Sequence, residues 1–361
     1  MDTNLKLGLD SVFRKFWPYF TCMLMLKDNF QLLKTLSPAK LANAGKVVGS
    51  YYYSRSTNQP LMKGLPLSLS FEPTTSCNLR CPECPSGLRS FTRPTGMLQS
   101  ELFNKVVDEL HPSLLYMLLY FQGEPYLHPN FLELVNYASS KNIYTATSTN
   151  AHYLTDEKAR QTVESGLSRL IVSLDGTTQE VYQQYRIGGK LEKVLAGVER
   201  VMAWRKKLKS QTPTVIFQFL VVKPNEHQIP DAKKLAKTLG VDDVWYKTAQ
   251  IYDYENGSPL IPTLDKYSRY KKGKDSKWYI KNKLFNHCWK MWHSAVVTWD
   301  GKVVPCCFDK DATHRLGNLQ ENSFEDIWHS PTYNKFRKAL LKGRDQIEIC
   351  KNCTEGTKVW G

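Results

Sequence analysis

The chain has no apolar run long enough to cross a bilayer. Its longest uninterrupted apolar runs, such as Leu114 to Phe121, contain about eight residues, whereas a membrane helix needs about 20. The apolar stretch from Phe20 to Leu26 follows Arg14 and Lys15, but it is short, contains Thr21 and lacks a small-residue cleavage site for a signal peptide. The sequence therefore predicts a cytoplasmic protein.

Acidic side chains are few relative to basic ones. The 361 residues include 49 Lys and Arg but 34 Asp and Glu, a formal net charge of +15. Basic residues gather with aromatic ones in residues 1–65, and a second basic group spans residues 266–283. Such patches attract anionic lipid, nucleic acid or acidic substrates, although a solvated surface is the simpler interpretation.

We expect no specific nucleic-acid binding. The N-terminal mixture of basic and aromatic residues is also typical of a helix that lies on the inner surface of a membrane. Packing of that helix onto the rest of the protein would need the same apolar face, so both alternatives stay open.

The cysteine pattern does not indicate disulfides. The chain holds nine Cys, and eight of them lie in groups spaced like metal ligands, which suits a reducing compartment. Apolar residues make up 42% of the chain, which is ample for a packed core. Because single cores stop growing near ~250 to 300 residues, we expect the 361 residues to form two domains.

Cys77, Cys81 and Cys84 form a Cys-x3-Cys-x2-Cys loop directly after the strand-like run Leu67 to Phe71. Three thiolates this close can bind three irons of a 4Fe-4S cube and leave the fourth iron open to a small molecule. A zinc knuckle is the alternative, but it needs a fourth Cys or His nearby, and none occurs before His111. The spacing therefore favours a catalytic iron-sulfur cluster.

From Leu65 to about Ile251, strand-like apolar runs alternate with segments of helical spacing. The expected strands are Leu67 to Phe71, Leu115 to Phe121, Ile143 to Thr147, Arg169 to Leu174, Val215 to Val222 and Val244 to Lys247. The expected helices are Ser100 to Leu110, Asn130 to Lys141, Asp156 to Ser165, Leu191 to Lys207 and Gln228 to Leu239. Strands separated by helices form parallel β/α units, so we predict an α/β fold with six such units.

The cysteine loop reads Glu72-Pro-Thr-Thr-Ser-Cys77-Asn-Leu-Arg-Cys81-Pro-Glu-Cys84-Pro and resembles that of the radical S-adenosylmethionine (radical SAM) enzymes. In that family the open iron chelates the amino and carboxylate groups of SAM. One-electron reduction splits SAM into methionine and a 5′-deoxyadenosyl radical, which abstracts hydrogen from the substrate. The resemblance also implies a partial TIM barrel, (β/α)6, with catalytic loops at the C-terminal ends of its strands.

The loop after the second expected strand resembles another motif of this family. Gln122-Gly123-Glu124-Pro125 is similar to the family's Gly-Gly-Glu-Pro, with Gln122 in place of the first glycine. The resemblance implies that Gly123, Glu124 and Pro125 hold the SAM amino group through backbone and carboxylate. A carboxylate suits that role because a cationic amine at a dry site needs a charged or strongly polar acceptor.

Three further loops match the family in order along the chain. Asn150 stands in a turn that resembles the family's Thr-Asn-Gly, and Ser173 and Asp175 match its Ser-x-Asp-Gly pattern. The resemblance places Asn150 near the SAM or substrate pocket and gives Ser173 a part in ribose and carboxylate recognition. Arg186 falls where related enzymes carry an arginine near the SAM carboxylate, which a guanidinium pairs with well.

The C-terminal cysteines resemble the SPASM/twitch extensions of radical SAM enzymes. Cys288 is followed by a hairpin-like Trp299-Asp300-Gly301-Lys302, then by Cys306-Cys307 and by Cys350-x2-Cys353. The full SPASM form has further cysteines and binds two auxiliary clusters, whereas this sequence ends at Gly361 without them. The resemblance therefore implies one auxiliary 4Fe-4S cluster, most simply held by Cys288, Cys306, Cys350 and Cys353.

A structural zinc site with four cysteine ligands also fits these bare spacings. Cys307 is additional, and we expect it to be a buried small side chain. Asp309 follows the cysteine pair closely and is a candidate catalytic base, by resemblance to a carboxylate near the auxiliary cluster of sulfatase-maturating enzymes.

These patterns predict a basic helical segment in residues 1–64, a radical SAM partial barrel in residues 65–265, and a linker with a small SPASM/twitch domain in residues 266–361. The resemblance implies SAM and two 4Fe-4S clusters as cofactors, and a flavodoxin- or ferredoxin-type electron donor. Hydrogen abstraction would lead either to oxidation or to bond formation.

The substrate stays open between a peptide or protein and a small, sugar or lipid-linked molecule, which the basic N-terminus favours slightly. A non-enzymatic iron-sulfur or zinc scaffold is a remote alternative, because a scaffold needs no SAM-binding loops.

Overall fold

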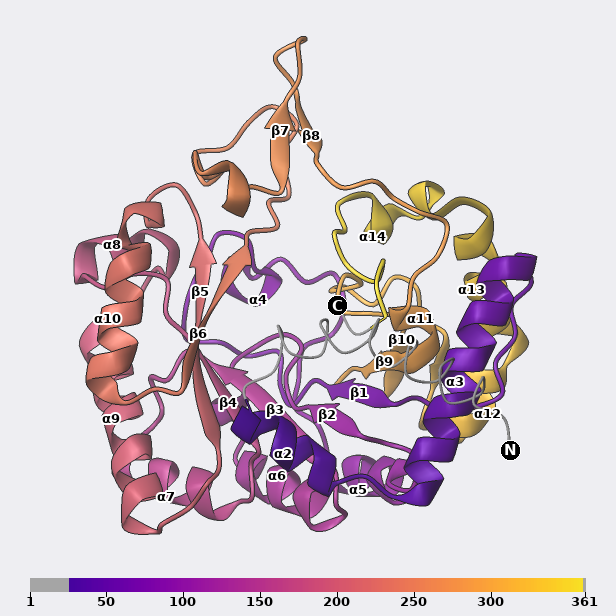
Figure 1. The fold of residues 1–361 in the computed structure, drawn as a ribbon, viewed down its shortest axis with the longest axis horizontal. Helices are drawn as coiled ribbons and strands as arrows, with labels where there is room; N and C mark the ends of the chain where they lie inside the picture. Colours follow the sequence, from indigo (N-terminus) through magenta and orange to yellow (C-terminus); the bar gives the residue numbers. More distant parts are fainter. Residues whose placement is uncertain (1–25, 360–361) are drawn as a thin grey trace, which may run out of the picture.

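A computed structural model describes residues 26–359 of the chain, and Figure 1 shows its ribbon. Residues 1–25 of the N-terminal segment for which we predict membrane contact lie outside the described residues, and so does Cys22, the one cysteine outside the ligand-like groups. No helix within residues 26–359 is long and apolar enough to cross a membrane.

Six parallel strands form the centre of one sheet, in the order β1 to β6. They are β1 (Ser68–Phe71), β2 (Tyr116–Leu118), β3 (Tyr144–Thr149), β4 (Arg169–Ser173), β5 (Thr214–Val221) and β6 (Asp243–Thr248). All six predicted strands are present. The sheet ends at β6 instead of closing on itself, which confirms the predicted partial barrel.

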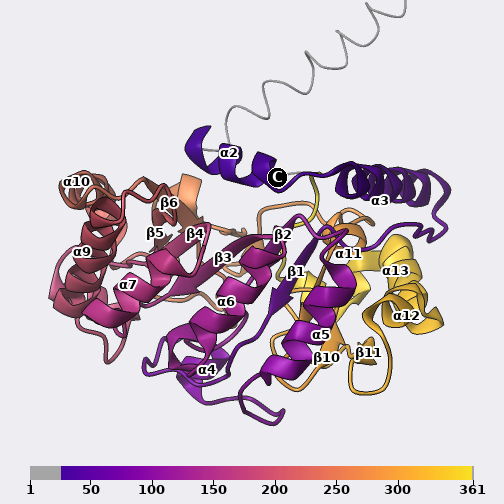
Figure 2. The ribbon, with the colours of Figure 1, turned by 90° about the horizontal axis from the view of Figure 1, so that it is seen from below.

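Helices cover the outer face of this sheet (Figures 1 and 2). The five predicted ones are α5 (Ser100–Leu110), α6 (Phe131–Ser140), α7 (Asp156–Glu164), α9 (Leu191–Lys207) and α10 (Ile229–Leu239). Outward strand residues such as Leu69, Met117 and Val172 share one core cluster with helix residues such as Phe103 and Val198. Burial of these matching apolar faces holds the β/α units together. Two short helices between these units, α4 (Pro85–Leu88) and α8 (Gln179–Tyr185), were not predicted.

The inner face of the sheet is less apolar and less tightly covered. Ser68 and Ser70 of β1, Tyr116 of β2 and Gln218 of β5 point to this side and are only half-buried. Alternation along each strand puts the apolar residues outside and these side chains inside. The barrel therefore encloses a partly polar interior.

The N-terminal helices α2 (Leu26–Lys34) and α3 (Pro38–Thr57) lie on the opposite side of the molecule from α5 and α6 (Figure 2). Asp28 of α2 is buried, where it pairs with Arg169 of β4 and accepts a hydrogen bond from the Tyr144 hydroxyl. Tyr51 of α3 packs edge-on against Trp289 and Trp292. The predicted N-terminal helical segment thus contacts both the barrel and the C-terminal region.

The C-terminal region extends the barrel sheet. β9 (Ser294–Val297) pairs in parallel with β1, and β10 (Lys302–Val304) and β11 (Gly317–Asn318) follow as antiparallel strands. The antiparallel pairing of β9 with β10 confirms the hairpin expected around residues 299–302. The sequence predicts a separate C-terminal domain, whereas in the structure this region is joined to β1 by the backbone hydrogen bonds of β9.

Short helices complete the C-terminal region: α11 (Lys290–His293), α12 (Phe324–His329), α13 (Pro331–Gly343) and α14 (Glu348–Lys351). Between barrel and C-terminal region, the hairpin of β7 (Tyr270–Lys272) and β8 (Trp278–Ile280) projects from the body of the molecule (Figure 1).

Candidate active site

Cys77, Cys81 and Cys84 lie in one loop after the C-terminal end of β1, where parallel barrels carry their catalytic groups. We call residues 77–84 the cysteine loop. Burial, with smaller contributions from the charges of Glu124, Cys81 and Cys84, raises the pKa of the Cys77 thiol to about 11. The three sulfurs therefore lie close enough to one another to interact. A bound metal would offset the raised pKa values, because the metal's charge stabilises the deprotonated thiolate that coordinates it.

This donor set fits the iron-sulfur cluster that the sequence predicts. Three thiols from one short loop can each bind one iron of a 4Fe-4S cube. Residues 26–359 contain no group of three Cys, His, Asp or Glu side chains close enough to hold a single metal ion. A cube, in contrast, spreads its thiolate ligands over several irons.

Glu124 joins the cysteine loop to two other loops of the barrel. Its backbone N–H donates to the carbonyl of Ser76 at 2.7 Å. Its buried carboxylate accepts from the Thr149 hydroxyl at 2.6 Å and from the N–H groups of Asn150 at 2.7 Å and Tyr126 at 3.2 Å. Since a carboxylate has about four lone-pair sites, it can accept one further donor such as an ammonium group.

Gly123 lets the Glu124 loop approach the chain beside the cysteine loop. Its φ of +75° lies in the left-handed region, and a Cβ there would lie 2.2 Å from the carbonyl oxygen of Thr74. Only glycine fits this contact without movement of the backbone. Pro125 follows Glu124 and begins the short helix η1 (Pro125–Leu127).

Asn150 extends from the end of β3 toward the cysteine loop. Its Nδ2 donates to Oδ1 of Asn78 at 2.8 Å and lies 4.0 Å from Sγ of Cys77. The structure thus brings Asn150 and Glu124, from the loops after β3 and β2, to the same place beside the cysteine loop.

Asp175 and Arg186 form a buried ion pair, with Nε of Arg186 2.5 Å from the Asp175 carboxylate. The second Asp175 oxygen accepts from the N–H of Leu220 at 2.8 Å. Arg186 Nη1 lies 3.6 Å from Sγ of Cys81, so the pair borders the cysteine loop. Ser173 ends β4 on the inner face, in register with Gln218.

The four cysteines expected at the auxiliary cluster gather in the C-terminal region; we call Cys288, Cys306, Cys350 and Cys353 the auxiliary cysteines. Burial raises the pKa of all four thiols, and the charge of Cys288 acts on each of the other three.

Two neighbouring residues define the surroundings of these thiols. Arg344 donates to Sγ of Cys353 at 3.2 Å, which places a cation at the group. Gly356 passes so near Cys288 that a Cβ on it would lie 2.2 Å from that sulfur. Four thiols with a nearby cation fit a fully coordinated iron-sulfur cluster.

Cys307 is exposed, so the prediction that it is a buried small side chain is wrong. Its thiol interacts with the charges of Lys290 and Lys310, which face the space between barrel and C-terminal region. Cys307 also interacts with the adjacent Cys306, so the two thiols lie close together and differ in their exposure.

Asp309 is buried and bonded within its own loop. Its carboxylate accepts from the N–H and hydroxyl of Thr313 at 2.8 and 2.9 Å, and from the N–H of His314 at 2.9 Å. These contacts favour a role in holding the loop over the role of base.

Sequence analysis missed Lys310 and Tyr252, which meet beside the cysteine loop. Lys310 Nζ donates to the Tyr252 hydroxyl at 2.9 Å, and both residues interact with the charge of Cys84. The only available signal was the position of Lys310, three residues after the Cys306-Cys307 pair.

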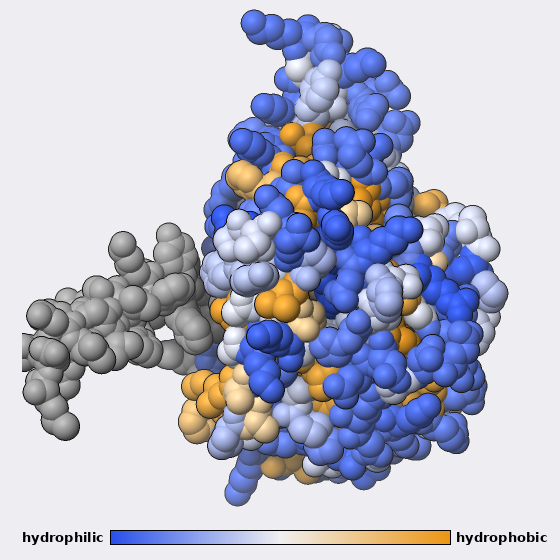
Figure 3. All heavy atoms as spheres, turned by 90° about the vertical axis from the view of Figure 1, so that its right-hand side faces the viewer, coloured by the Kyte–Doolittle hydropathy of each residue, from blue (hydrophilic) through white to orange (hydrophobic). Residues whose placement is uncertain are grey.

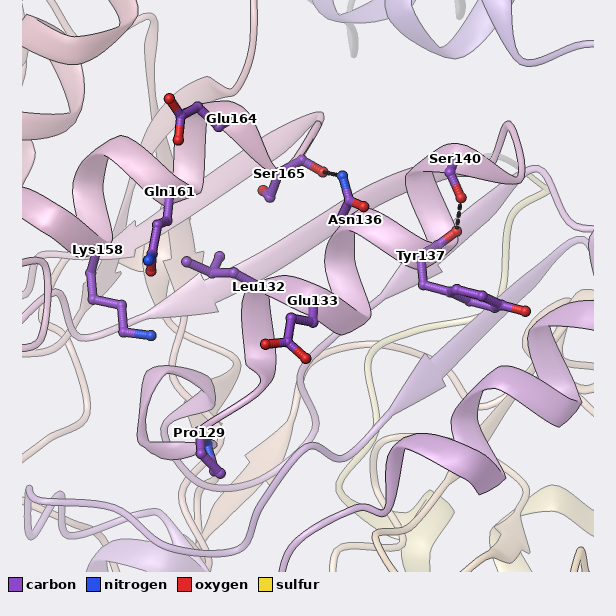
Figure 4. A pocket seen from close by; sticks show the side chains of 10 residues that line it. All are labelled: Pro129, Leu132, Glu133, Asn136, Tyr137, Ser140, Lys158, Gln161, Glu164 and Ser165. Atoms are coloured by element: carbon purple, nitrogen blue, oxygen red, sulfur yellow. Dashed lines mark hydrogen bonds between the residues drawn. The ribbon is translucent and has the colours of Figure 1, made fainter.

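A cavity of about 440 Å³ lies elsewhere, between α6 and α7 on the outer face (Figure 4). It contains none of the cysteines. Its lining residues are Pro129, Leu132, Glu133, Asn136, Tyr137, Ser140, Lys158, Gln161, Glu164 and Ser165. We assign it no part in the chemistry.

Two family profiles match the chain. Residues 71–235 match the radical SAM superfamily, and residues 288–354 match an iron-sulfur cluster-binding domain known as SPASM. The two matched ranges contain the cysteine loop and all four auxiliary cysteines.

The chain is also similar to characterised proteins. It is 28% identical to the tungsten-containing aldehyde ferredoxin oxidoreductase cofactor-modifying protein of Pyrococcus furiosus, over 74% of this chain and 82% of that protein. It is 26% identical to the PqqA peptide cyclase of Gluconobacter oxydans, over 82% of this chain and 85% of that protein. The crystal structure of Streptococcus suis SuiB bound to S-adenosylmethionine shares the fold, with a TM-score of 0.60 at 13% identity over 85% of this chain and 75% of SuiB.

The fold and the two matched domains define a radical SAM enzyme with a C-terminal iron-sulfur domain. The chain belongs to the radical SAM superfamily, in its SPASM group. Its cofactors are S-adenosylmethionine and 4Fe-4S clusters.

Proposed function

We propose that Cys77, Cys81 and Cys84 hold the catalytic 4Fe-4S cluster and that the loops around them bind SAM. When bound, cluster and SAM together supply reductive cleavage of SAM and a 5′-deoxyadenosyl radical that abstracts hydrogen from the substrate. The observation that carries the proposal is the convergence of Glu124, Asn150 and Arg186, from the connections that follow β2, β3 and β4, on the cysteine loop.

Each side chain has a distinct part in this arrangement. The remaining acceptor site of Glu124 receives the SAM ammonium group, because a buried carboxylate stabilises a cation strongly. Asn150 and Ser173 offer polar groups at the same ends of the strands. Gly123 and Pro125 keep the Glu124 loop close to the cysteine loop. Arg186 is held by Asp175 and presents its positive charge to the thiolate of Cys81 and to the SAM carboxylate.

The auxiliary cysteines hold a second 4Fe-4S cluster, in the domain that we assign to residues 266–361. The pairing of β9 with β1 attaches this region to the strand that carries the cysteine loop. An electron from the substrate could then leave through the second cluster during an oxidation. A flavodoxin- or ferredoxin-type donor reduces the first cluster, whose potential has to be low.

Iron content and SAM cleavage test this assignment. Anaerobically reconstituted protein should contain about eight irons per chain, and the triple variant with Ala at the three cysteine-loop positions should retain about four. Reduced wild-type protein should form 5′-deoxyadenosine from SAM, whereas the triple variant should not. Stoichiometric zinc without iron would contradict the proposal.

A second proposal concerns contact with an anionic membrane surface. Five of the largest exposed apolar side chains lie on the N-terminal helices, which occupy one side of the molecule (Figure 2): Phe30, Leu33, Leu41, Tyr52 and Tyr53. Residues 29–71 contain basic side chains but no Asp or Glu. Figure 3 shows that the adjoining face is mostly hydrophilic. Apolar residues among cations favour the headgroup region of anionic lipid.

A further inference from the structure

Four cationic side chains from four separate segments meet where the barrel faces the C-terminal region. They come from β6, from the loop before β7, from the start of α11 and from the loop after Cys307: Lys247, Arg269, Lys290 and Lys310. We call them the basic cluster. Three of them lie near one carboxylate, Glu355: Lys290 forms an ion pair with it, and Lys247 and Arg269 interact with its charge.

Lys310 connects this cluster to the cysteine loop. Its ammonium group donates to the Tyr252 hydroxyl at 2.9 Å. Burial lowers the pKa of Lys310, whereas Cys84 and Cys307 act in the opposite direction, and Arg269 lowers it further. Lys310 therefore lies between the cysteine loop and the other three cations.

Arg269 has hydrogen-bonding capacity that the protein does not use. Its Nε donates to the carbonyl and hydroxyl oxygens of Thr248, at 3.2 and 2.9 Å. Its Nη1 is buried and has no hydrogen-bond partner among the described residues. A buried donor without a partner is costly, and a guanidinium group is shaped to bind two oxygens of an oxyanion.

Lys247 and Lys290 extend the same positive surface. Lys247 projects from the face of β6 that carries Trp245, whose ring packs under Arg169 in the barrel interior, and its side chain is exposed there. Lys290 pairs with Glu355, with Nζ 3.0 Å from Oε2. The Tyr120 hydroxyl, at the end of β2, lies near Cys307, Lys290 and Glu355.

The carboxylates that face the four cations do not balance them. Glu355 pairs with Lys290, and Glu83 lies near Lys310 while it accepts from the N–H of Tyr252 at 2.8 Å. Within residues 26–359, Lys290 is the one member of the basic cluster that forms an ion pair, and Lys247 and Arg269 contact no carboxylate directly. A ligand with about two negative charges would complement Lys247 and Arg269, and it would supply the acceptor that the buried Nη1 of Arg269 lacks.

Two members of the basic cluster also lie near proposed cluster ligands, since Cys306 interacts with Lys290 and Cys84 with Lys310, and each cysteine group has a further cation of its own. Arg186 contacts Cys81 of the cysteine loop, and Arg344 contacts Cys353 of the auxiliary cysteines. Arg269, in contrast, contacts Thr248 and no cysteine. The basic cluster lies between the two cysteine groups, where a substrate would have to sit to lose hydrogen to the radical.

We propose that the substrate is a phosphorylated small molecule and that the basic cluster binds its phosphate. The side chains of Arg269 and Lys247 provide the contacts that no protein group takes up, while Lys290 and Lys310 hold the side nearest the cysteines. This inference rests on the proposed function, since it places the substrate between the two clusters. It identifies a substrate class that the cysteine loop and the SAM loops do not specify.

The test uses the reconstituted, anaerobic holoenzyme and inorganic pyrophosphate as probe, titrated by calorimetry at constant ionic strength. Lys247→Gln combined with Arg269→Gln should weaken pyrophosphate binding about tenfold or more, since charged hydrogen bonds are lost. Lys274→Gln combined with Lys277→Gln removes the same charge from the exposed hairpin between β7 and β8 and should leave binding unchanged.

Three outcomes would overturn the inference. They are equal loss of binding in both double variants, tighter binding of succinate than of pyrophosphate, and unchanged pyrophosphate binding with a shifted cluster potential in the first variant. The last outcome would mean that Lys247 and Arg269 adjust the reduction potential of a cluster and do not bind phosphate. Iron content and SAM cleavage of the wild type are measured beside these titrations, so that a failure of the proposed function is recognised separately.

Discussion

Glu124 links three loops of the barrel. Its carboxylate accepts three hydrogen bonds from Thr149, Asn150 and Tyr126, and its N–H bonds to the chain just before Cys77. Sequence resemblance suggested contact with SAM, and the geometry adds a role in holding the loops.

Glu124→Ala should therefore weaken SAM binding by about 10- to 100-fold, because a hydrogen bond to a charged group contributes ~1.5–3 kcal/mol. The iron content should stay near that of the wild type, since no cysteine is lost. Equilibrium dialysis with labelled SAM measures the effect, and Glu133→Ala on the exposed face of α6 is the matched control. Equal SAM affinity in both variants would mean that Glu124 does not bind SAM and is only a turn residue.

Cys306 and Cys307 are neighbours in sequence with different surroundings. Cys306 interacts with Cys307 and also with Cys288 and Cys353, whereas Cys307 is exposed and interacts with Lys290. Cys306→Ser should lose about four of eight irons, and Cys307→Ser should keep nearly all of them. Iron assays and the absorbance of the reconstituted variants measure this difference. The reverse pattern would mean that Cys307, and not Cys306, is the cluster ligand.

At the scale of elements, α2 depends on one buried ion pair. Asp28 contacts Arg169 and Tyr144, at positions far away in the sequence, and Arg169 also lies over the rings of Tyr116 and Trp245. This ion pair holds α2 against the inner side of the barrel.

Asp28→Asn should lower the free energy of unfolding by about 3–5 kcal/mol, because it leaves Arg169 buried without its charge partner. Urea denaturation of the anaerobic holoenzyme measures the loss. A double variant, Asp28→Leu with Arg169→Met, should recover part of the stability, since it removes both charges. A loss below about 1 kcal/mol for Asp28→Asn, as for a surface pair, would mean that other contacts hold α2.

At the scale of the whole molecule, the N-terminal helices form one basic and apolar side. If this side contacts lipid, the holoenzyme should float with anionic vesicles at low salt and be released as salt rises, because the attraction is screened beyond ~8 Å at physiological ionic strength. Leu33→Ser combined with Leu41→Ser should reduce flotation.

The control for flotation replaces Leu208 and Leu264, which are exposed to a similar degree on other parts of the surface. Their replacement by Ser should leave flotation unchanged. Flotation that is absent at low salt, or equal in the two double variants, would mean that the N-terminal basic residues form an ordinary solvated surface and not a membrane contact.

Sequence by itself determined the β/α units and the chemistry of the cysteine loop. Strand and helix patterns follow from side chains two to four residues apart, so β4 (Arg169–Ser173) and α9 (Leu191–Lys207) are found almost where predicted. The spacing of Cys77, Cys81 and Cys84 likewise lies within one loop, where local order suffices to indicate a shared ligand.

Only the tertiary structure decided which distant segments meet. Pairing of β9 with β1, burial of Asp28 against Arg169, exposure of Cys307 and the gathering of the basic cluster leave no periodic pattern in the chain. Each depends on contacts between residues far apart in sequence, which the packing of the whole fold selects. Hence the sequence indicated a radical SAM enzyme, whereas the charge of its substrate could be inferred only from the folded molecule.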